Sequence, residues 1–378
     1  MKDIRYVGWD VDSEKILVAV AEPGGEVRAL GAIPYREESV RRLIRKLGPA
    51  KRLRVCYEAG PHGYGLYWLL TKLGVHCDVV APTLVPVKSG DRVKTNRRDA
   101  EKLARCYRSG DLTAVWVPDA AHEALRDLVR AREVAKKDQL RARHRLGKFL
   151  LRRGLRAAEG VKNWTLKHLL WIKTLRFERP EQEATFLDYL HEVEHQAERV
   201  KRLDLAIDQA IESAPVEMRA LIVALQALRG IQTVSAATLV AEVGPVSRFA
   251  RPKQLMGYSG MVSSENSTGT SVRRGAITKT GNAHVRRILG EAAWAYQYRP
   301  AMSPELKKRQ EGLSEEVKEI AWKAQHRLCS RYRRLTAKGK LRQKVMTAIG
   351  RELLGFIWAI GIQVEKELSH RKRPEKAA

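Results

Sequence analysis

Strand-like and helix-like segments alternate over the first 115 residues of the chain, and the alternation then stops. Three apolar runs separated by turn residues come first, over residues 4–11, 15–21 and 27–33, and indicate a meander of three strands. Segments with helical or strand spacing then follow in turn, over residues 39–47, 53–57, 64–73, 75–80 and 96–108. This order is that of an RNase H-like α/β domain, which we assign to residues 1–118.

No strand-like stretch occurs between residues 119 and 225, where Arg, Lys, Glu, Leu and Ala dominate. The spacing of the apolar residues predicts long helices over 123–151 and 182–225, with a connector at Arg179-Pro180. We expect them to form an antiparallel coiled-coil arm. Most of its charges would be solvated helix faces, and its function would be dimerisation and electrostatic contact with nucleic acid.

Residues 226–378 are predicted to form a third, helical domain. A helix, a turn containing Gly230 and a second helix up to Val243 resemble a helix-hairpin-helix unit, which presents backbone N–H groups to a phosphate. A polar loop rich in Gly, Ser and Thr follows over residues 259–281, and then come helices over 282–295 and from 315 to the end. The predicted fold class is therefore α/β followed by all-α.

The chain carries an unusually large positive charge: 71 Lys and Arg against 43 Asp and Glu give a formal net charge of +28. The basic residues alternate with apolar ones, as in residues 140–146 and 331–335, which suits folded helices with basic faces. A charge of this size costs self-repulsion, and its commonest partner is a phosphate polymer. We therefore expect nucleic acid as the partner.

Neither the cysteines nor the apolar runs point to an exported or membrane protein. The four cysteines show no close pairing and no metal-ligand spacing, which is typical of reduced thiols. The N-terminus has no charged-then-apolar leader. The apolar stretch 353–362 is shorter than the roughly 18 residues of a membrane span and is expected to be a buried helix. We expect a cytoplasmic protein.

Three acidic residues stand at the ends of elements predicted in the first domain. Asp10 ends the first strand, Glu58 ends the strand expected beside it, and Asp99 lies at the start of a helix. In an RNase H-like sheet these points converge at one edge, and carboxylates are suitable ligands for Mg²⁺. Two such ions about 3.5–4 Å apart can hold the attacking and leaving oxygens of a phosphodiester. The alternative for each acid alone is a solvated loop residue.

Hydroxyl side chains and glycines crowd residues 263–275, where a pair of arginines closes the stretch. This composition suits a hydroxyl nucleophile with phosphate clamps, and the alternative is a flexible loop. Basic side chains predicted to bind nucleic acid are Arg273, Arg274, Lys279, Arg286 and Arg287. For the last two, the alternative is a solvated helix face.

Aromatic residues lie among Lys and Arg in the C-terminal third of the chain. They are Trp294, Tyr296, Tyr298, Trp322, Tyr332 and Trp358. Stacking on unpaired bases is one interpretation, and core packing at helical spacing is the other.

Several short segments occur in a fixed order along nearly the whole chain. They are Gly8-Trp9-Asp10, Tyr57-Glu58-Ala59-Gly60, Lys94-Thr95-Asn96-Arg97-Arg98-Asp99-Ala100, Gly230-Ile231, Arg248-Phe249, Gln254-Leu255, Ser267-Thr268-Gly269, Gly275-Ala276-Ile277-Thr278-Lys279-Thr280-Gly281-Asn282 and Glu291-Ala292-Ala293-Trp294-Ala295-Tyr296. Together they resemble the DEDD-type transposases of the insertion-sequence one-ten family, relatives of the pilin-gene invertases. The last segments are most similar to the one-one-one-one subgroup.

The resemblance implies a RuvC-like N-terminal domain with an Asp, Glu, Asp, Asp tetrad. Transferred to this sequence, the tetrad is Asp10, Glu58, Asn96 and Asp99. Asn96 departs from the pattern, because its amide oxygen can contact a metal ion but brings no charge. Weaker Mg²⁺ binding, or binding by fewer acids, is the expected consequence.

The resemblance also implies a C-terminal serine that attacks the DNA phosphate and forms a covalent link. The matching position, just before Gly269, holds Thr268, and Ser267 lies beside it. Threonine is a usable but more hindered nucleophile, so position favours Thr268 and reactivity favours Ser267. We give position the greater weight and expect Thr268, because a shift of one residue would also displace Arg273 and Arg274. On an extended loop the two side chains would point in opposite directions, so that only one faces the phosphate.

The family further implies an element-encoded guide RNA, or bridge RNA, that pairs with donor and target DNA. It also implies an active site assembled between domains of different subunits in a dimer or tetramer. We thus expect an RNA-guided transposase that cuts and rejoins DNA through a hydroxyl nucleophile with Mg²⁺. The alternatives are a RuvC-like nuclease that uses metal-activated water, and a catalytically impaired nucleic-acid-binding relative.

Overall fold

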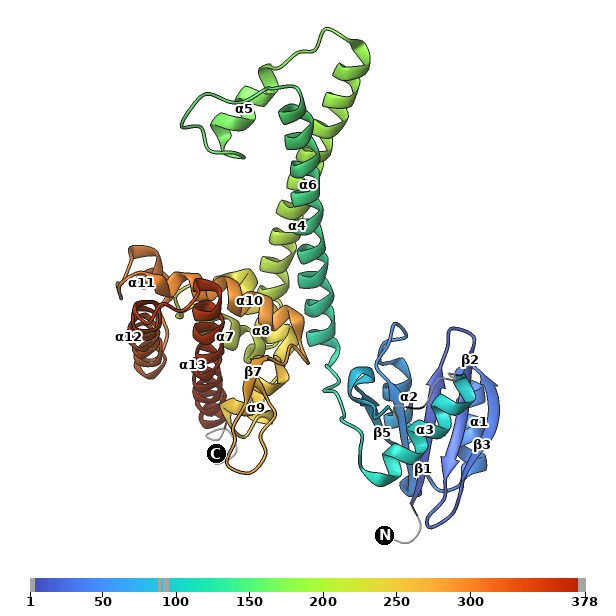
Figure 1. The fold of residues 1–378 in the computed structure, drawn as a ribbon. Coiled ribbons are helices and arrows are strands. Elements are labelled where there is room, and N and C mark those ends of the chain that lie inside the picture. The colour runs from blue at the N-terminus through green and yellow to red at the C-terminus, as the bar shows by residue number, and fades with distance from the viewer. Residues whose placement is uncertain (1–3, 88–89, 91–94, 373–378) are drawn as a thin grey trace. The chain divides into compact units, whose positions relative to one another are not determined.

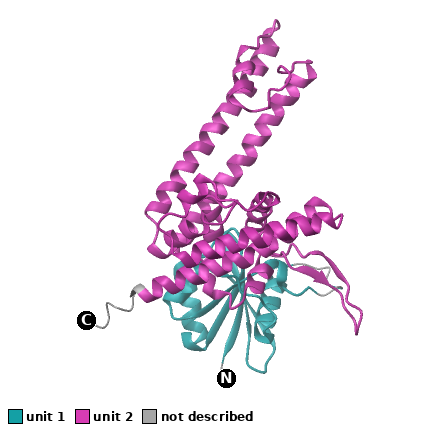
Figure 2. Cartoon of the chain, turned by 90° about the vertical axis from the view of Figure 1, so that its left-hand side faces the viewer, with its two compact units in different colours: residues 1–117 teal, residues 118–378 magenta. Residues whose placement is uncertain are grey.

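The computed structural model describes residues 4–87, 90 and 95–372. The chain divides into two compact units, residues 1–117 and 118–378, which Figure 2 colours separately. Each unit is described by itself below.

The first unit is built on one five-stranded sheet (Figure 1). Its strands are β1 (Arg5–Val11), β2 (Lys15–Ala21), β3 (Val27–Pro34), β4 (Leu53–Glu58) and β5 (His76–Val80). Their order in the sheet is β3-β2-β1-β4-β5, with the first three strands antiparallel and with β4 and β5 parallel to β1. The meander, the sheet and the alternation with helices confirm the predicted α/β fold of this region.

Helices cover both faces of this sheet. They are α1 (Glu37–Leu47), α2 (Gly65–Lys72) and α3 (Asn96–Ser109). Val40 and Leu70, from α1 and α2, pack in one cluster with Trp9 and Tyr57. Apolar residues of α3 pack on the opposite face, against small residues of β2 and against β4. Strand side chains alternate between these two faces, and β2 and β4 bury apolar side chains on both, whereas the edge strand β3 has no buried residue.

Gly8 sets the distance between α3 and the sheet. A Cβ atom at this position would lie 2.4 Å from both the Ala100 carbonyl oxygen and the Ala104 nitrogen. Only glycine therefore allows the backbone of α3 to cross β1 this closely. The first turn of α3 is thereby held next to the carboxyl end of β1.

The second unit begins with two long helices, α4 (Ala120–Arg152) and α6 (Pro180–Glu212), which pack along each other. They extend away from the other helices of this unit, and a short helix, α5 (Leu166–Thr174), lies at their far end (Figure 1). The sequence did not predict α5. Its nine residues are too short to show a clear helical period.

The helix predicted over residues 182–225 is wrong in its length. The structure has two helices there, because α6 ends at Glu212 and α7 (Val216–Leu225) begins after Pro215. Proline lacks an N–H group and its ring clashes with the preceding turn, so a helix cannot run through it without a break or kink. The apolar spacing continues across the break and conceals it.

The remaining helices of the second unit, the short α11 excepted, contribute buried residues to one apolar core. They are α7, α8 (Thr233–Val243), α9 (Pro252–Tyr258), α10 (Ala283–Ala293), α11 (Pro304–Arg309), α12 (Glu315–Ala337) and α13 (Arg342–Lys372). The single helix expected from residue 315 to the end is in fact the pair α12 and α13. Gly339, with φ +68°, follows α12 in the left-handed conformation that commonly ends helices.

Helix α13 corrects the estimate made for the apolar stretch 353–362. This stretch belongs to a longer helix that, over Arg342–His370, is long and apolar enough by composition to cross a membrane. Its side chains nevertheless form part of the core: Leu353, Leu354 and Ile360 are fully buried among the other helices. Burial of this kind is typical of a central helix in a helical protein.

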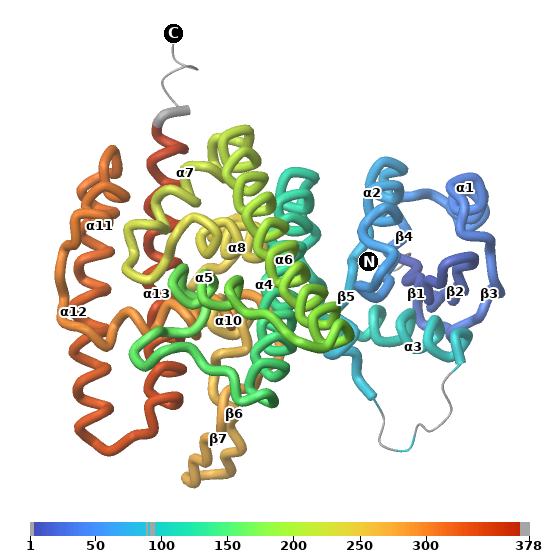
Figure 3. Tube along the Cα trace, turned by 90° about the horizontal axis from the view of Figure 1, so that it is seen from above, coloured from blue at the N-terminus to red at the C-terminus, as the bar shows by residue number. Residues whose placement is uncertain are grey.

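The polar loop predicted over residues 259–281 contains a β-hairpin. Its strands are β6 (Ser263–Glu265) and β7 (Arg274–Ile277), which pair antiparallel. The hairpin projects beyond the helices near it (Figure 3). We refer to residues 263–277 as the hydroxyl hairpin.

Candidate functional site

Asp10 and Glu58 lie at the carboxyl ends of two neighbouring parallel strands, on the same face of the sheet. Glu58 is the last residue of β4, whereas β1 runs one residue beyond the predicted end at Asp10, to Val11. The register pairs Trp9 of β1 with Tyr57 of β4, so Asp10 and Glu58 are the next positions on each strand. Trp9 and Tyr57 face α1 and α2. Because side chains alternate and neighbouring strands lie about 4.8 Å apart, both carboxylates belong to the α3 face, side by side.

The first turn of α3 brings two further predicted residues to this face. Thr95 caps the helix, its hydroxyl accepting a hydrogen bond from the Arg98 N–H at 3.4 Å. Asp99, half-buried, directly precedes Ala100, which packs on Gly8. Asn96 is exposed one turn earlier. A carboxylate in a first turn is favoured by the helix dipole. Lys94, quoted in the same motif, lies outside the described residues.

Asp10 and Glu58 fit a magnesium ion by the chemistry of their donors. Both supply hard oxygen ligands, and Mg²⁺ in proteins is usually held by one or two carboxylates, waters and substrate phosphates. Within residues 4–87, 90 and 95–372, no three His, Cys, Asp or Glu side chains converge closely enough to hold a metal ion. A contribution of Asp99 to a metal site with these two carboxylates stays a prediction.

The tip of the hydroxyl hairpin is a tight turn. Thr268 and Ser271 exchange both backbone hydrogen bonds, at 3.0 and 3.1 Å, and Gly269 between them has φ +58°. A glycine with positive φ at the first central position is characteristic of two-residue hairpin turns. The glycine that follows the predicted nucleophile is thus explained by the turn. Ser267 and Thr268 precede this turn, with Thr268 in an antiparallel β-bridge to Ser271, and which of the two hydroxyls faces a phosphate stays a prediction.

Ser267 has a carboxylate within hydrogen-bond distance. Its hydroxyl donates to Oε1 of Glu265 at 2.9 Å, and Oε2 of Glu265 accepts from Nε of Arg274 at 3.3 Å. All three side chains are exposed. In the described part of the chain, the hydroxyl of Thr268 has no hydrogen-bond partner. Glu265 was not among the predicted site residues, although an acid two residues before a candidate nucleophile is a visible signal in the sequence.

The hairpin stands on a rigid base formed by two crossing backbones. Lys279 and Asn282 donate backbone hydrogen bonds to Gly260 and Tyr258, at 3.0 and 2.9 Å. A Cβ atom on Gly260 would lie 2.3 Å from the Thr280 carbonyl oxygen, so a side chain cannot be accommodated there. The orientation of the hairpin relative to α9 and α10 is therefore fixed at its base.

The predicted nucleic-acid-binding residues differ in their surroundings. Arg273 and Lys279 are exposed on or beside the hairpin. Arg286 donates to the Ser259 carbonyl at 2.7 Å and thus braces the hairpin base. Arg287 pairs with Glu133 and Glu291, at 3.1 and 2.9 Å. These ion pairs compete with phosphate, and contact of Arg286 or Arg287 with nucleic acid stays a prediction.

A buried carboxylate, missed by the sequence analysis, connects the arm to the hairpin base. Glu242 of α8 is fully buried and accepts two hydrogen bonds from Arg130 of α4, at 2.7 and 2.9 Å. It also accepts one from Asn282 at 2.7 Å, and its backbone carbonyl accepts from the Tyr258 hydroxyl at 2.7 Å. Burial alone would raise the pKa of Glu242, but hydrogen bonds from Arg130 and Asn282 and the positive charges of Arg130 and Arg126 outweigh it and lower the pKa.

A second carboxylate ties α4 to α10. Glu133 accepts from Lys137 and His284, each at 2.7 Å, and from Arg287 at 3.1 Å. Desolvation by itself would raise the pKa of Glu133, yet these donors and charges lower it to about 2. Glu133 is therefore ionised at neutral pH and holds the arm against the helix that follows the hairpin.

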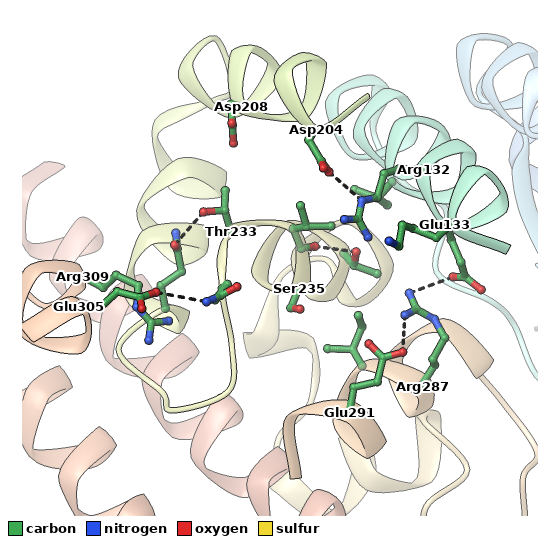
Figure 4. A pocket seen from close by; sticks show the side chains of 17 residues that line it. Arg132, Glu133, Asp204, Asp208, Thr233, Ser235, Arg287, Glu291, Glu305 and Arg309 are labelled. Atoms are coloured by element: carbon green, nitrogen blue, oxygen red, sulfur yellow. Dashed lines mark hydrogen bonds and ion pairs between the residues drawn. The ribbon is translucent and has the colours of Figure 1, made fainter. Parts of the chain in front are cut away.

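A cavity of about 550 Å³ opens beside Glu133, between α4, α6, α8 and α10 (Figure 4). The first residues of α8 line it, including Thr233 and Ser235. Its walls carry both signs of charge, and several of these charges are paired, as in the Arg132–Asp204 ion pair of 2.8 Å. The acidic side chains disfavour an anion, and the phosphate contact expected at the turn before α8 stays a prediction.

The C-terminal aromatic residues are divided between core and surface. Tyr296 is fully buried, and the indole N–H of Trp358 donates to the Phe249 carbonyl at 2.8 Å. Trp294, Trp322 and Tyr298 are exposed. Core packing is therefore confirmed for Tyr296 and Trp358.

Two parts of the chain match known protein families. Residues 7–153 match the DEDD transposases of the IS110 type. Residues 223–309 match the transposase IS116/IS110/IS902 family. The first match includes Asp10, Glu58, Asn96 and Asp99, and the second includes the hydroxyl hairpin.

Individual relatives are similar over most of their length. "Putative transposase y4qE" of Sinorhizobium fredii (strain NBRC 101917 / NGR234) is 45% identical, over 96% of this chain and 90% of its own. The transposase for insertion sequence element IS1533 of Leptospira borgpetersenii is 33% identical, over 90% and 99%. The transposase for insertion sequence element IS1111A of Coxiella burnetii (strain RSA 493 / Nine Mile phase I) is 23% identical, over 78% of each chain.

Proposed function

The chain belongs to the IS116/IS110/IS902 family of transposases, and from this membership we propose that it is an RNA-guided DNA recombinase with a hydroxyl nucleophile. Family membership by itself implies an enzyme that cuts and recombines DNA, with DNA as its substrate. The guide RNA, the covalent intermediate and the metal ion are the parts that we propose.

The observation that carries the hydroxyl chemistry is the hydrogen bond from Ser267 to Glu265, at 2.9 Å. A general base must lie within about 2.6–3.2 Å of the hydroxyl whose proton it takes. Glu265 meets this condition for Ser267, whereas Thr268 has only its position before Gly269 in its favour. We therefore favour Ser267 over Thr268 as the nucleophile.

In the proposed step, Oγ of Ser267 attacks the scissile phosphate and its proton passes to Glu265. A bond forms between Oγ and phosphorus, and the bond from phosphorus to one DNA oxygen breaks. That oxygen takes up a proton and leaves as a hydroxyl. Reversal by a different DNA hydroxyl rejoins the strands, so the phosphodiester energy is kept without ATP. Arg274 holds Glu265 through its ion pair of 3.3 Å, and the exposed Arg273 and Lys279 would hold phosphates.

In this proposal the carboxylates at the carboxyl ends of β1 and β4 act on the same phosphate. Mg²⁺ bound there would polarise the phosphate and stabilise the charge of the transition state. Asp10 and Glu58 would hold the ion, and Asp99 would join them. Asn96 can contribute an amide oxygen but no charge, which weakens the site relative to a fourth acid.

The proposed partners are a guide RNA encoded with the element, donor and target DNA, and further copies of the chain in a dimer or tetramer. The net charge of +28 supports a polyanionic partner. The long α4–α6 pair supports the proposed coiled-coil function in assembly, because it extends away from the core of its unit. The expected location is the cytoplasm.

A second candidate function is a RuvC-like nuclease that uses metal-activated water. The carboxylate pair of Asp10 and Glu58 favours it, because that pair needs no hydroxyl hairpin. A denaturing gel separates the candidates: DNA is incubated with the protein and a divalent ion, with RNA supplied or omitted. We expect a denaturation-resistant protein–DNA adduct whose yield depends on RNA.

Each other result of that gel contradicts a defined part of the proposal. Cleavage without an adduct would establish the nuclease, and an equal adduct yield without RNA would remove RNA guidance. Binding without cleavage, under conditions in which a family relative is active, would indicate the catalytically impaired binder.

A further inference from the structure

We propose that the far end of the arm holds a pocket for an unpaired nucleotide. A cavity of about 500 Å³ lies between α4, the segment 153–165 and α5. It is at the opposite end of α4 from the helices that carry the hydroxyl hairpin (Figure 1). The inference rests on the proposed nucleic-acid partners but not on the proposed nucleophile or metal ion.

The wall of this pocket includes three neighbouring rings, one pair edge to face and the other tilted. Trp164 and His168 lie 5.5 Å apart between ring centroids, and His168 and Trp171 lie 5.4 Å apart. Both tryptophans are half-buried, so each is held by the arm while part of its surface stays accessible. Aromatic side chains held in this way are the usual platform on which unpaired bases stack.

The charged side chains that line the pocket are basic. Arg143, Lys148 and Arg156 line it, and none of the described lining residues is Asp or Glu. Nε of Arg143 is buried and has no hydrogen-bond acceptor in the described residues, while its guanidinium group lies 5.4 Å from the centre of the Trp164 ring. The cavity beside Glu133 differs, since acids and bases are paired there. A phosphate-bearing ligand is therefore favoured here.

The backbone of Trp164 is held in a conformation that a bulky residue rarely adopts, with φ +66°. Three contacts maintain it. The Trp164 N–H donates to Nδ1 of His168 at 3.2 Å, and Thr165 caps α5 through the His168 N–H at 3.4 Å. The ring lies over Gly147 of α4, where a Cβ atom would be 3.8 Å away.

The rare conformation and the glycine both indicate a built site. Glycine inside a helix is less favourable than alanine, and Gly147 lines the pocket. Strain of this kind persists where the surrounding structure enforces it, often at ligand sites. Two locally unfavourable features thus hold the Trp164 ring in place: the positive φ of Trp164 and a glycine, Gly147, inside helix α4.

An unpaired nucleotide fits this combination better than a second copy of the chain. Bases in a duplex are stacked on each other and offer no free face to Trp164. Another copy of a chain with net charge +28 would bring like charge to a pocket lined by cations. Single-stranded RNA and single-stranded DNA share the required base and phosphate, so both are test ligands.

The test measures binding of the full-length chain to fluorescent oligonucleotides of one length: single-stranded RNA, single-stranded DNA and duplex DNA. Trp164→Ala should weaken single-strand binding about tenfold, the loss expected of one stacked base, and Trp164→Phe should restore most of it. Duplex binding should change less than twofold.

A second pair of variants leaves the aromatic side chains of the pocket unchanged. Lys148→Ala with Arg156→Ala should weaken single-strand binding more than the matched pair Lys201→Ala with Arg202→Ala, which removes two exposed charges elsewhere on the arm. Weaker binding of single-stranded RNA or of single-stranded DNA supports the pocket and identifies which of the two it binds. Equal losses for single strands and duplex, or none, would overturn it, as would unchanged binding with loss of self-association.

The outcome is independent of the proposed chemistry. If no covalent adduct ever forms, the proposed reaction fails while the binding difference at Trp164 still stands.

Discussion

Arg130 of α4 and Glu242 of α8 form a two-pronged ion pair, at 2.7 and 2.9 Å, although 112 positions separate them in the chain. The carboxylate is fully buried, and the same residue contacts Asn282 at the hairpin base. The arm and the base of the hydroxyl hairpin are thus held by one side chain.

Replacing this carboxylate should destabilise the second unit. Glu242→Ala removes the hydrogen-bond acceptor of Arg130 and Asn282 and the counter-charge that lies 3.8 Å from the buried Arg126, and breaking a buried pair typically costs about 3–5 kcal/mol. We expect a clearly lower midpoint of denaturant unfolding. As a control, Glu291→Gln removes an exposed i, i+4 pair with Arg287 and should cost at most about 1 kcal/mol. Equal effects of the two variants would contradict the structural role of Glu242.

The packing of α3 on Gly8 predicts a loss of function without a change in any acid. A Cβ atom at Gly8 would lie 2.4 Å from the backbone of α3, so Gly8→Ala must displace the helix that carries Asp99. We expect slower divalent-ion-dependent DNA cleavage, measured on a labelled substrate. Gly65→Ala is the control, because its Cβ meets no atom within 4 Å. Wild-type cleavage by Gly8→Ala would show that this placement is not needed.

The carboxylates at the sheet edge predict a requirement for a divalent ion. Asp10→Ala or Glu58→Ala should abolish strand cleavage while nucleic-acid binding stays near normal, because the basic surface is unchanged. Asn96→Asp adds the missing charge and should lower the Mg²⁺ concentration needed for half-maximal cleavage. Full cleavage in the presence of EDTA would remove the metal ion from the mechanism.

The ion pairs of Glu133 predict a pH dependence of stability. Its pKa falls from the ordinary 4.5 to about 2 on folding, because Lys137, His284 and Arg287 favour the charged form. The stabilisation is complete above about pH 4.5 and is lost as the pH falls towards about 2. Unfolding should therefore separate the unchanged chain from Glu133→Gln at pH 5, and the difference should shrink by pH 3. A constant difference would contradict these contacts.

The first unit could be predicted in detail from the sequence because its signals are local. Turn residues separate its strands, and the acids follow apolar runs directly, so Asp10 and Glu58 could be assigned to one edge. That both lie on the α3 face depends on the strand register and on Gly8. The strand register and the close packing at Gly8 follow from the sequence, but they can be recognised only in the folded structure.

The second unit shows where local signals fail. The strands of the hydroxyl hairpin are three and four residues long, and their hydroxyls and glycines look like a loop. Glu242 appears in the sequence as a single acid in an apolar helix, and its partner Arg130 is too distant in the chain to be paired with it. The Trp164 pocket combines residues from two helices and a connecting segment.

The identity of the attacking oxygen tests the central claim most directly. A trapped protein–DNA adduct is digested, and mass spectrometry locates the residue that carries the nucleotide. We predict the adduct on Ser267, its loss in Ser267→Ala, its survival in Thr268→Ala, and adduct formation at least about 100-fold slower in Glu265→Gln, the lower end of general-base effects. Ser264→Ala, which removes a neighbouring hydroxyl, should be neutral. An adduct on Thr268, or cleavage with none, would contradict the account.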